Sequence, residues 1–181
     1  FNGETESASV TYRLATTENV AEAVDVYLEE VAGGYALYFM NGETKTYIRV
    51  YHRTDGDPGY GKGSLELVTS APAEALSYFE DADTFIYDYD GNNAYYMGTY
   101  STYTTFSVSN TSYITGDKAA NIGVTQFPAY LYEIAEGGDE PDVPDVPDAP
   151  EAGDVVTAPE AETAYYLGVD IGNKLYITGS A

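Results

Sequence analysis

Short segments in which apolar and polar residues alternate recur from residue 10 to residue 134 of the chain. Alternation with a period of two is typical of β-strands that bury one face. The pattern predicts strands over 24–30, 35–39, 47–51, 65–68, 84–89, 95–98, 105–109, 112–115 and 129–134. Two helix-like segments, 18–23 and 71–76, are too short to form a helical layer. The pattern therefore predicts an all-β fold.

Two turn signals divide these strands into units of about fifty residues. Asn41-Gly42 and Asp90-Gly91 favour tight hairpins, because both central positions of a type I′ turn take positive φ. The two signals lie 49 residues apart. The segment that follows the second one, Ala94 to Gly98, is matched near the end of the chain by Ala164 to Gly168. This spacing indicates internal repetition.

The order of strands within the units places the end of the chain before its beginning. The third unit has strands near Tyr95, Phe106, Tyr113 and Tyr130. The first unit shows the same order if the segments at 165 and 175 precede residue 1. We therefore expect 1–134 to form an incomplete domain, with 164–181 as its missing first hairpin.

Three all-β repeats with this rhythm resemble the β-trefoil, specifically the ricin-B-like and fascin-like repeat domains of secreted bacterial surface proteins. The resemblance covers residues 1–134 and 164–181, and it implies a trefoil-like fold of three repeats. Carbohydrate-binding members of that family carry a Gln-x-Trp motif in each repeat. This chain has no Trp, and its one glutamine, Gln126, precedes Phe127-Pro128. The family's sugar sites are therefore not carried over.

The segment 135–163 differs sharply in composition from the rest of the chain. It contains ten acidic residues, five prolines and no basic residue. Its central part repeats a Pro-Asp-Val type triplet, and a three-residue period matches the turn of a polyproline II helix. We predict an acidic, proline-rich linker that is stiff and solvated. In the alternative, its Val and Ala edge docks onto a partner.

Charge and composition restrict the partners of the chain. Thirty acidic residues against seven basic ones give a net charge of −23, which repels nucleic acid and anionic membranes. The chain has no cysteine, so disulfides and thiolate metal sites are excluded. We expect no nucleic-acid partner and no membrane insertion. An extracellular location on a bacterial surface fits the resemblance.

The residue types that carry chemistry form no recognisable catalytic motif. His52 lies between Tyr51 and Arg53 with no nucleophile motif around it, so we predict no enzyme and no cofactor. Asp88 and Asp90 loosely resemble the start of a calcium loop, but the later bidentate Glu is missing. A hairpin turn without an ion is the favoured interpretation. The 20 tyrosines could stack on sugars or fill the core, and their alternation favours the core.

These observations lead to a hypothesis of self-assembly. A domain without its first hairpin exposes an apolar groove and strand edges, which another chain can fill. Head-to-tail donation of 164–181 would build an extracellular filament or surface array from copies of the same chain. The same order fits completion of its own domain, or a tandem polypeptide in which Ala181 continues into Phe1 of the next copy. A carbohydrate-binding or adhesion module that contacts surface glycans is the alternative function. The predicted interface residues are Tyr165, Tyr166, Leu167, Val169, Ile171, Leu175, Tyr176 and Ile177.

Overall fold

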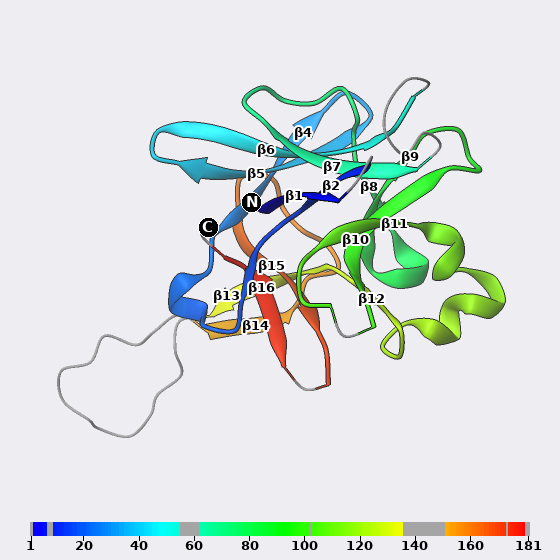
Figure 1. Ribbon diagram of the computed structural model, residues 1–181. Coiled ribbons are helices and arrows are strands. Elements are labelled where there is room, and N and C mark those ends of the chain that lie inside the picture. The colour runs from blue at the N-terminus through cyan, green and yellow to red at the C-terminus, as the bar shows by residue number, and fades with distance from the viewer. Residues whose placement is uncertain are drawn as a thin grey trace.

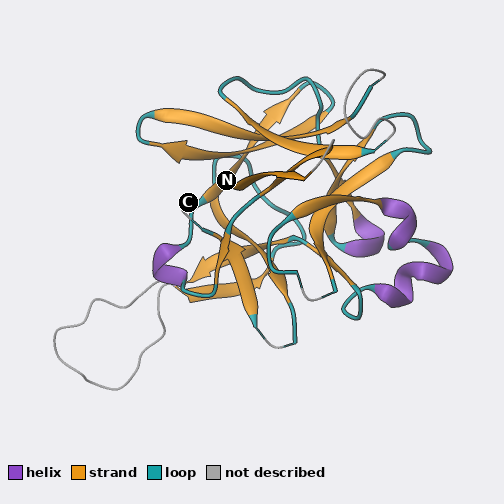
Figure 2. Cartoon of the chain, viewed as in Figure 1, coloured by secondary structure: helices purple, strands orange, loops and turns teal. Residues whose placement is uncertain are grey.

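The computed structural model describes residues 2–6, 9–54, 62–101, 103–135, 151–172 and 174–179. Over these residues the chain is all-β, as the sequence predicts, and its strands form two curved sheets and a separate hairpin (Figure 1). Helical structure is limited there to short 3-10 turns at the periphery (Figure 2): η1 (Val20–Glu22), η2 (Glu80–Ala82), η3 (Thr111–Tyr113) and η4 (Gly116–Asn121). Within the same residues, no helix has the length and apolarity needed to cross a membrane.

The larger sheet has nine strands and contains both the first half of the chain and its end. Its order is β14-β13-β15-β4-β5-β6-β7, and β16 pairs with both β15 and β3. The strands are β3 (Thr16–Thr17), β4 (Val26–Val31), β5 (Gly34–Asn41), β6 (Thr44–His52), β7 (Gly63–Val68), β13 (Tyr130–Ala135), β14 (Glu151–Val155), β15 (Ala164–Asp170) and β16 (Leu175–Thr178). Every pairing in this sheet is antiparallel.

The smaller sheet has five strands from the middle of the chain. Its order is β11-β10-β9-β8, with β12 also paired to β10. The strands are β8 (Ser77–Phe79), β9 (Thr84–Asp88), β10 (Ala94–Tyr100), β11 (Ser107–Asn110) and β12 (Gln126–Pro128). A separate hairpin, β1 (Asn2–Glu6) and β2 (Ser9–Arg13), lies beside β7 (Figure 1).

Backbone hydrogen bonds join the two sheets at both sides, so that the strands follow one another around a shared core. On one side Tyr35 of β5 and Leu76 exchange two bonds, of 2.9 and 2.7 Å. On the other side lies Ala129, the residue that links β12 of the smaller sheet to β13 of the larger one. Its N–H donates to the carbonyl of Met97 in β10 at 2.9 Å. The enclosed side chains form the main core: Leu14, Val26, Leu28, Leu37, Ile48, Val50, Leu65, Leu76, Phe85, Tyr95, Met97, Phe106, Phe127, Ala129, Leu131, Tyr165, Leu167 and Val169.

Local structure differs from the sequence prediction at several points. The tight turn predicted at Asp90-Gly91 is a five-residue loop, 89–93, because β9 ends at Asp88 and β10 begins at its partner Ala94. The predicted helix 71–76 is absent, because Leu76 is held extended by its two bonds to Tyr35. The predicted strand 112–115 begins instead as the 3-10 turn η3, since the Asn110 side chain accepts the Ser112 N–H and caps it. In the first hairpin the loop is Gly42–Glu43, one residue later than predicted, because Asn41 still pairs with Thr44.

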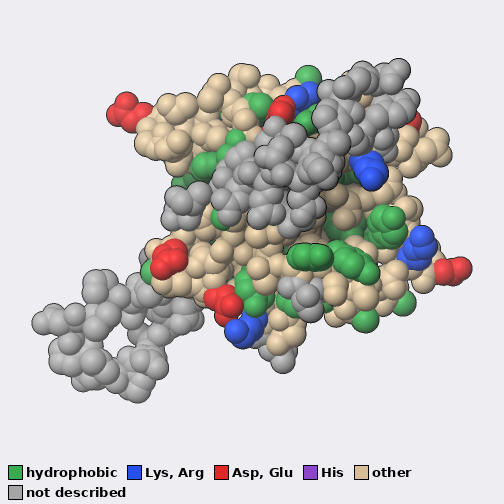
Figure 3. Space-filling view, in the orientation of Figure 1, with side chains coloured by type: hydrophobic (Ala, Val, Ile, Leu, Met, Phe, Trp, Pro, Cys, Tyr) green, Lys and Arg blue, Asp and Glu red, His purple; other side chains and the backbone are tan. Residues whose placement is uncertain are grey.

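On the face shown in Figure 3, the charged side chains of the described residues form no large patch of a single sign. Acidic and basic side chains of the described residues are interspersed there, and apolar side chains lie in small separate groups. Tyr89, Tyr100 and Tyr113 are among the large exposed hydrophobic residues, and they are treated as isolated side chains rather than as one apolar patch.

Candidate assembly interface

The C-terminal strand β15 is an interior strand of the larger sheet. It pairs with β13 over four positions, from Tyr130 with Gly168 to Glu133 with Tyr165. On its other side it pairs with the first residues of β4, where Tyr165 lies opposite Val26. Without β15, the strands β4 and β13 would both present unpaired backbone edges. In the structure, residues 164–179 therefore close the sheet of their own chain.

Both faces of β15 are buried, which explains its nearly unbroken apolar sequence. Tyr165, Leu167 and Val169 face the main core and are at most 5% exposed. Tyr166 faces the opposite side, where it packs with Tyr132 of β13 and Ile177 of β16. A strand that supplies two hydrophobic clusters at once contributes more burial than an edge strand of the same length.

The second strand of this hairpin is partly exposed. Ile177 and Thr178 are buried, and the Thr178 hydroxyl donates to the Leu167 carbonyl at 3.0 Å. Ile171, Leu175 and Tyr176 are partly buried against the two clusters. Five of the eight predicted interface residues are therefore buried within the fold of their own chain: Tyr165, Tyr166, Leu167, Val169 and Ile177.

The range predicted as a linker, 135–163, contains regular structure in its second half. Residues Glu151–Val155 form β14, which pairs with β13, and the Val156 N–H then donates to the Leu131 carbonyl at 2.8 Å. The outer edge of β13 offers unpaired backbone groups, and this accounts for the added strand. The proline triplets, within 136–150, lie outside the described residues. The element that returns to the sheet thus spans 151–179.

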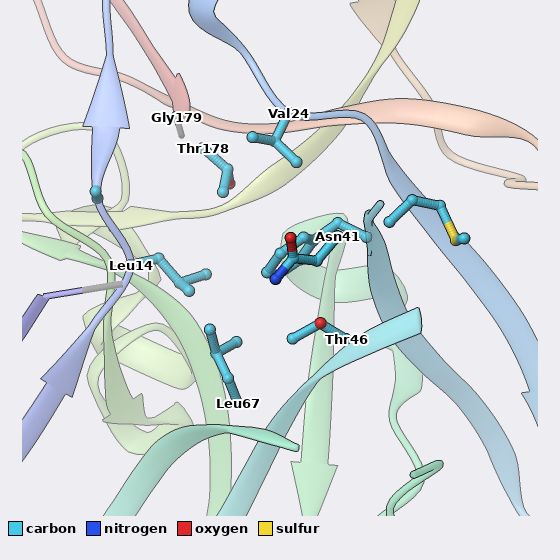
Figure 4. A pocket seen from close by; sticks show the side chains of 10 residues that line it. Leu14, Val24, Asn41, Thr46, Leu67, Thr178 and Gly179 are labelled. Carbon is cyan, nitrogen blue, oxygen red and sulfur yellow. The ribbon is translucent and has the colours of Figure 1, made fainter. Parts of the chain in front are cut away.

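The closing hairpin also lines a cavity of about 330 Å³ (Figure 4). Thr178 and Gly179 lie on one side of it, and Leu14, Val24 and Leu67 point toward the same space. The remaining lining residues are Ala15, Phe39, Met40, Asn41 and Thr46. The cavity is mostly apolar, and the described residues of its lining offer no carboxylate, imidazole or amine for acid–base catalysis.

The two weak calcium candidates stabilise a turn. The Asp88 carboxylate accepts the Gly91 N–H at 2.6 Å, and the Asp90 carboxylate accepts the N–H groups of Asn92 and Asn93. The side-chain amide of Asn93, followed by these backbone donors, lowers the pKa of Asp90. Among the described residues, no group of three or more His, Asp or Glu side chains is placed to hold a metal ion. Asp88 and Asp90 thus act here as turn residues.

Sequence patterns located strand β15 but not the residues that receive it. The hairpin groove is the space between β4 and β13 that β15 fills. Val26 and Tyr132 lie on its two bordering strands, and both strands look ordinary in the sequence. The residues opposite Tyr165 come from β4 and β13, and their pairing with β15 depends on the whole sheet. Comparison with known protein families, curated proteins and solved structures gives no match.

Tyr132 makes the closure sensitive to alkaline pH. Burial raises its pKa to about 12, so the folded state holds the phenol proton more tightly than the unfolded state does. The protonated Tyr132 phenol makes its full contribution to the unfolding free energy below about pH 10, and this contribution is lost as the pH rises toward 12. Tyr132→Phe is expected to reduce the loss of unfolding free energy between pH 10 and 12 by about 2 kcal/mol. Urea titrations at several pH values measure it.

The matched control is Tyr113→Phe, because Tyr113 is 48% exposed and lies outside the hairpin groove. Its stability should follow the wild-type pH profile. Equal profiles for the wild type and Tyr132→Phe would show that the Tyr132 phenol does not report on closure.

Proposed function

We propose that this chain is a structural subunit of an extracellular filament or surface array, assembled head-to-tail by donation of its C-terminal hairpin. The observation that carries the proposal is the position of β15, between β13 and β4 and buried on both faces. The proposed role is structural rather than catalytic, and the proposed partner is a second copy of the chain. The bacterial surface location remains part of the same proposal.

We further propose that the fold is trefoil-like, with three equivalent hairpins around the core. Three antiparallel pairs support this: β15 with β16, β5 with β6, and β10 with β11. Each hairpin begins with a strand that joins the ring of paired strands. In such a ring the first hairpin can be supplied by any copy of the sequence that reaches the gap.

Exchange between copies requires no new type of interaction. A hairpin from a neighbour would make the same backbone pairs with β4 and β13 as the chain's own hairpin, so the two arrangements differ mainly at the connection. Donation restores the strand pairing and the side-chain burial that opening of the chain removes. The balance between the closed chain and the filament therefore depends on the segment between β13 and β14.

The sequence of that connection disfavours a compact loop that brings its two ends together. Residues 136–150 contain six acidic residues and four prolines, and no basic residue. As polyproline II, fifteen residues would span about 45 Å. In the closed chain the two ends are a strand pair, Ala135 with Glu151, whose Cα atoms are about 5 Å apart. Chain stiffness and charge repulsion therefore favour donation to a second copy.

A pair of cysteines across the exchange boundary tests the proposal. Ile134 and Ala152 are strand partners on β13 and β14, at a separation that suits a disulfide. The native chain has no cysteine to interfere. After refolding at high protein concentration and oxidation, Ile134→Cys/Ala152→Cys should give a ladder of covalent oligomers on a non-reducing gel.

The control pair is Asn41→Cys/Thr44→Cys, which joins β5 to β6 within the part of the chain that is not exchanged. It should give monomers under every condition. Monomers from both pairs would refute donation, and covalent dimers alone would replace the filament by a reciprocal dimer.

A further inference from the structure

A second surface feature lies away from the hairpin groove, where β6 and β7 face the end of β9. It is a depression of about 360 Å³, within the roughly 300–1,000 Å³ range of small-ligand sites. Charged and aromatic side chains line most of it: Arg49, Tyr51, His52, Thr54, Glu66, Glu74, Tyr87 and Tyr89. Such a mixture differs from the apolar cavity beside Thr178.

Arg49, one of the lining residues, is held in place by two carboxylates. Its Nε donates to Glu74 at 2.8 Å, its Nη2 donates to the other oxygen of Glu74, and its Nη1 donates to Glu66. The guanidinium also lies over the Tyr51 ring, 4.5 Å from its centroid. The hydrogen bond from Arg49 lowers the pKa of Glu74, which keeps this carboxylate ionised. The planar groups are thus fixed before any ligand arrives.

A stack of aromatic rings forms the other wall. The rings of His52 and Tyr89 are nearly parallel, at 6°, with centroids 4.2 Å apart. A hydrogen bond fixes the His52 ring, because its Nδ1 lies 2.5 Å from the hydroxyl oxygen of the buried Tyr95. The Tyr89 ring is 47% exposed even though it stacks on the His52 ring. This arrangement presents a rigid aromatic surface to the solvent.

Polar groups around this surface retain hydrogen-bonding capacity. Within the described residues, the hydroxyls of Tyr51, Tyr87 and Tyr89 form no hydrogen bond, and Glu66 uses one carboxylate oxygen for Arg49. Three hydroxyls and a carboxylate oxygen can therefore donate to and accept from a ligand that carries several hydroxyl groups.

We propose that this depression binds a neutral hexopyranose, as a terminal or internal unit of a glycan. A pyranose ring combines an apolar face of C–H groups, which suits the exposed Tyr89 ring, with hydroxyls around its edge, which suit the planar polar groups. Two carboxylates already engage the Arg49 guanidinium, so these three groups carry one excess negative charge, which disfavours an anionic ligand and does not oppose a neutral sugar. An acidic sugar would meet repulsion from Glu66 and Glu74 and from the net charge of −23.

Titration of the full-length protein with defined methyl hexosides tests the proposal. The probes are the methyl glycosides of galactose, glucose and mannose, with glucuronic acid as the acidic comparison, and the readouts are saturation-transfer NMR and calorimetry. At least one neutral hexoside should bind, and glucuronic acid should bind more weakly. Tyr89→Ala should weaken the bound hexoside about tenfold, and Glu66→Gln should weaken it severalfold.

Tyr113→Ala is the matched control, because its ring is as exposed as that of Tyr89 and packs against Lys118 away from this depression. Its affinity should stay within twofold of the wild type, with thermal unfolding recorded for every variant. Absence of binding by all three neutral hexosides, unchanged binding by both Tyr89→Ala and Glu66→Gln, or preference for glucuronic acid would each overturn the proposal.

Discussion

Deletion of residues 160–181 is expected to leave a body that does not hold its fold. The deletion removes β15 and β16, and with them five buried apolar side chains. Burial of one such side chain is worth about 1.5–3 kcal/mol, so the five together approach the whole stability of an ordinary domain, about 5–15 kcal/mol. Circular dichroism and thermal unfolding should show loss of the cooperative transition in the truncated protein.

A synthetic peptide of residues 160–181 should restore this transition when it is added in trans, because it brings β15 and β16 back to the open strand edges. The control peptide carries Leu167→Asp and Val169→Asp, which place charges in the main core. It should not rescue. A truncated body with full stability, or equal rescue by both peptides, would contradict the role assigned to β15.

Gly34→Ala is expected to cost about 3 kcal/mol or more of unfolding free energy. A Cβ at this position would lie 2.2 Å from the Leu76 carbonyl oxygen, and φ is +154°. The backbone cannot yield easily there, because Tyr35 and Leu76 exchange the two hydrogen bonds that join the sheets. The substitution therefore disturbs the ring of strands where β5 meets the residue before β8. Urea unfolding monitored by tyrosine fluorescence measures the loss.

Gly42→Ala is the matched control in the neighbouring hairpin. Gly42 also has a positive φ, +62°, but a Cβ there would meet no atom within 4 Å. Its cost should be about 1 kcal/mol, from backbone strain alone. Equal costs for the two variants would show that the contact with Leu76 does not hold the sheets together.

The two proposed functions act on different parts of the molecule. Donation involves β13, β14, β15 and β16, whereas the depression proposed to bind a hexose lies on β6, β7, β9 and the loops that follow β7 and β9. A variant that blocks donation should therefore still bind sugar, and Tyr89→Ala should still assemble. A subunit with both properties would form a filament that displays one glycan site per copy.

The sequence by itself determined the class of the fold and the strands of the C-terminal hairpin. In 47–51, Ile48 and Val50 face the main core while Arg49 and Tyr51 stay partly exposed, and this period of two is a local property of a strand. The match between 94–98 and 164–168 likewise predicted that residues 164–168 form a strand. Its unbroken apolar run also fits a strand that is covered on both faces.

Only the tertiary structure decided what surrounds that hairpin. The partners of Tyr165 come from β4 and β13, more than a hundred residues apart in the chain, and no local pattern specifies such a pairing. The absence of a helix at 71–76 has the same cause, since Leu76 is held by Tyr35. His52 looked ordinary between Tyr51 and Arg53, and its stack with Tyr89 exists because the ends of β6 and β9 meet. Periodicity reports the environment of a side chain, whereas a site depends on contacts between distant segments, which the folded chain alone brings together.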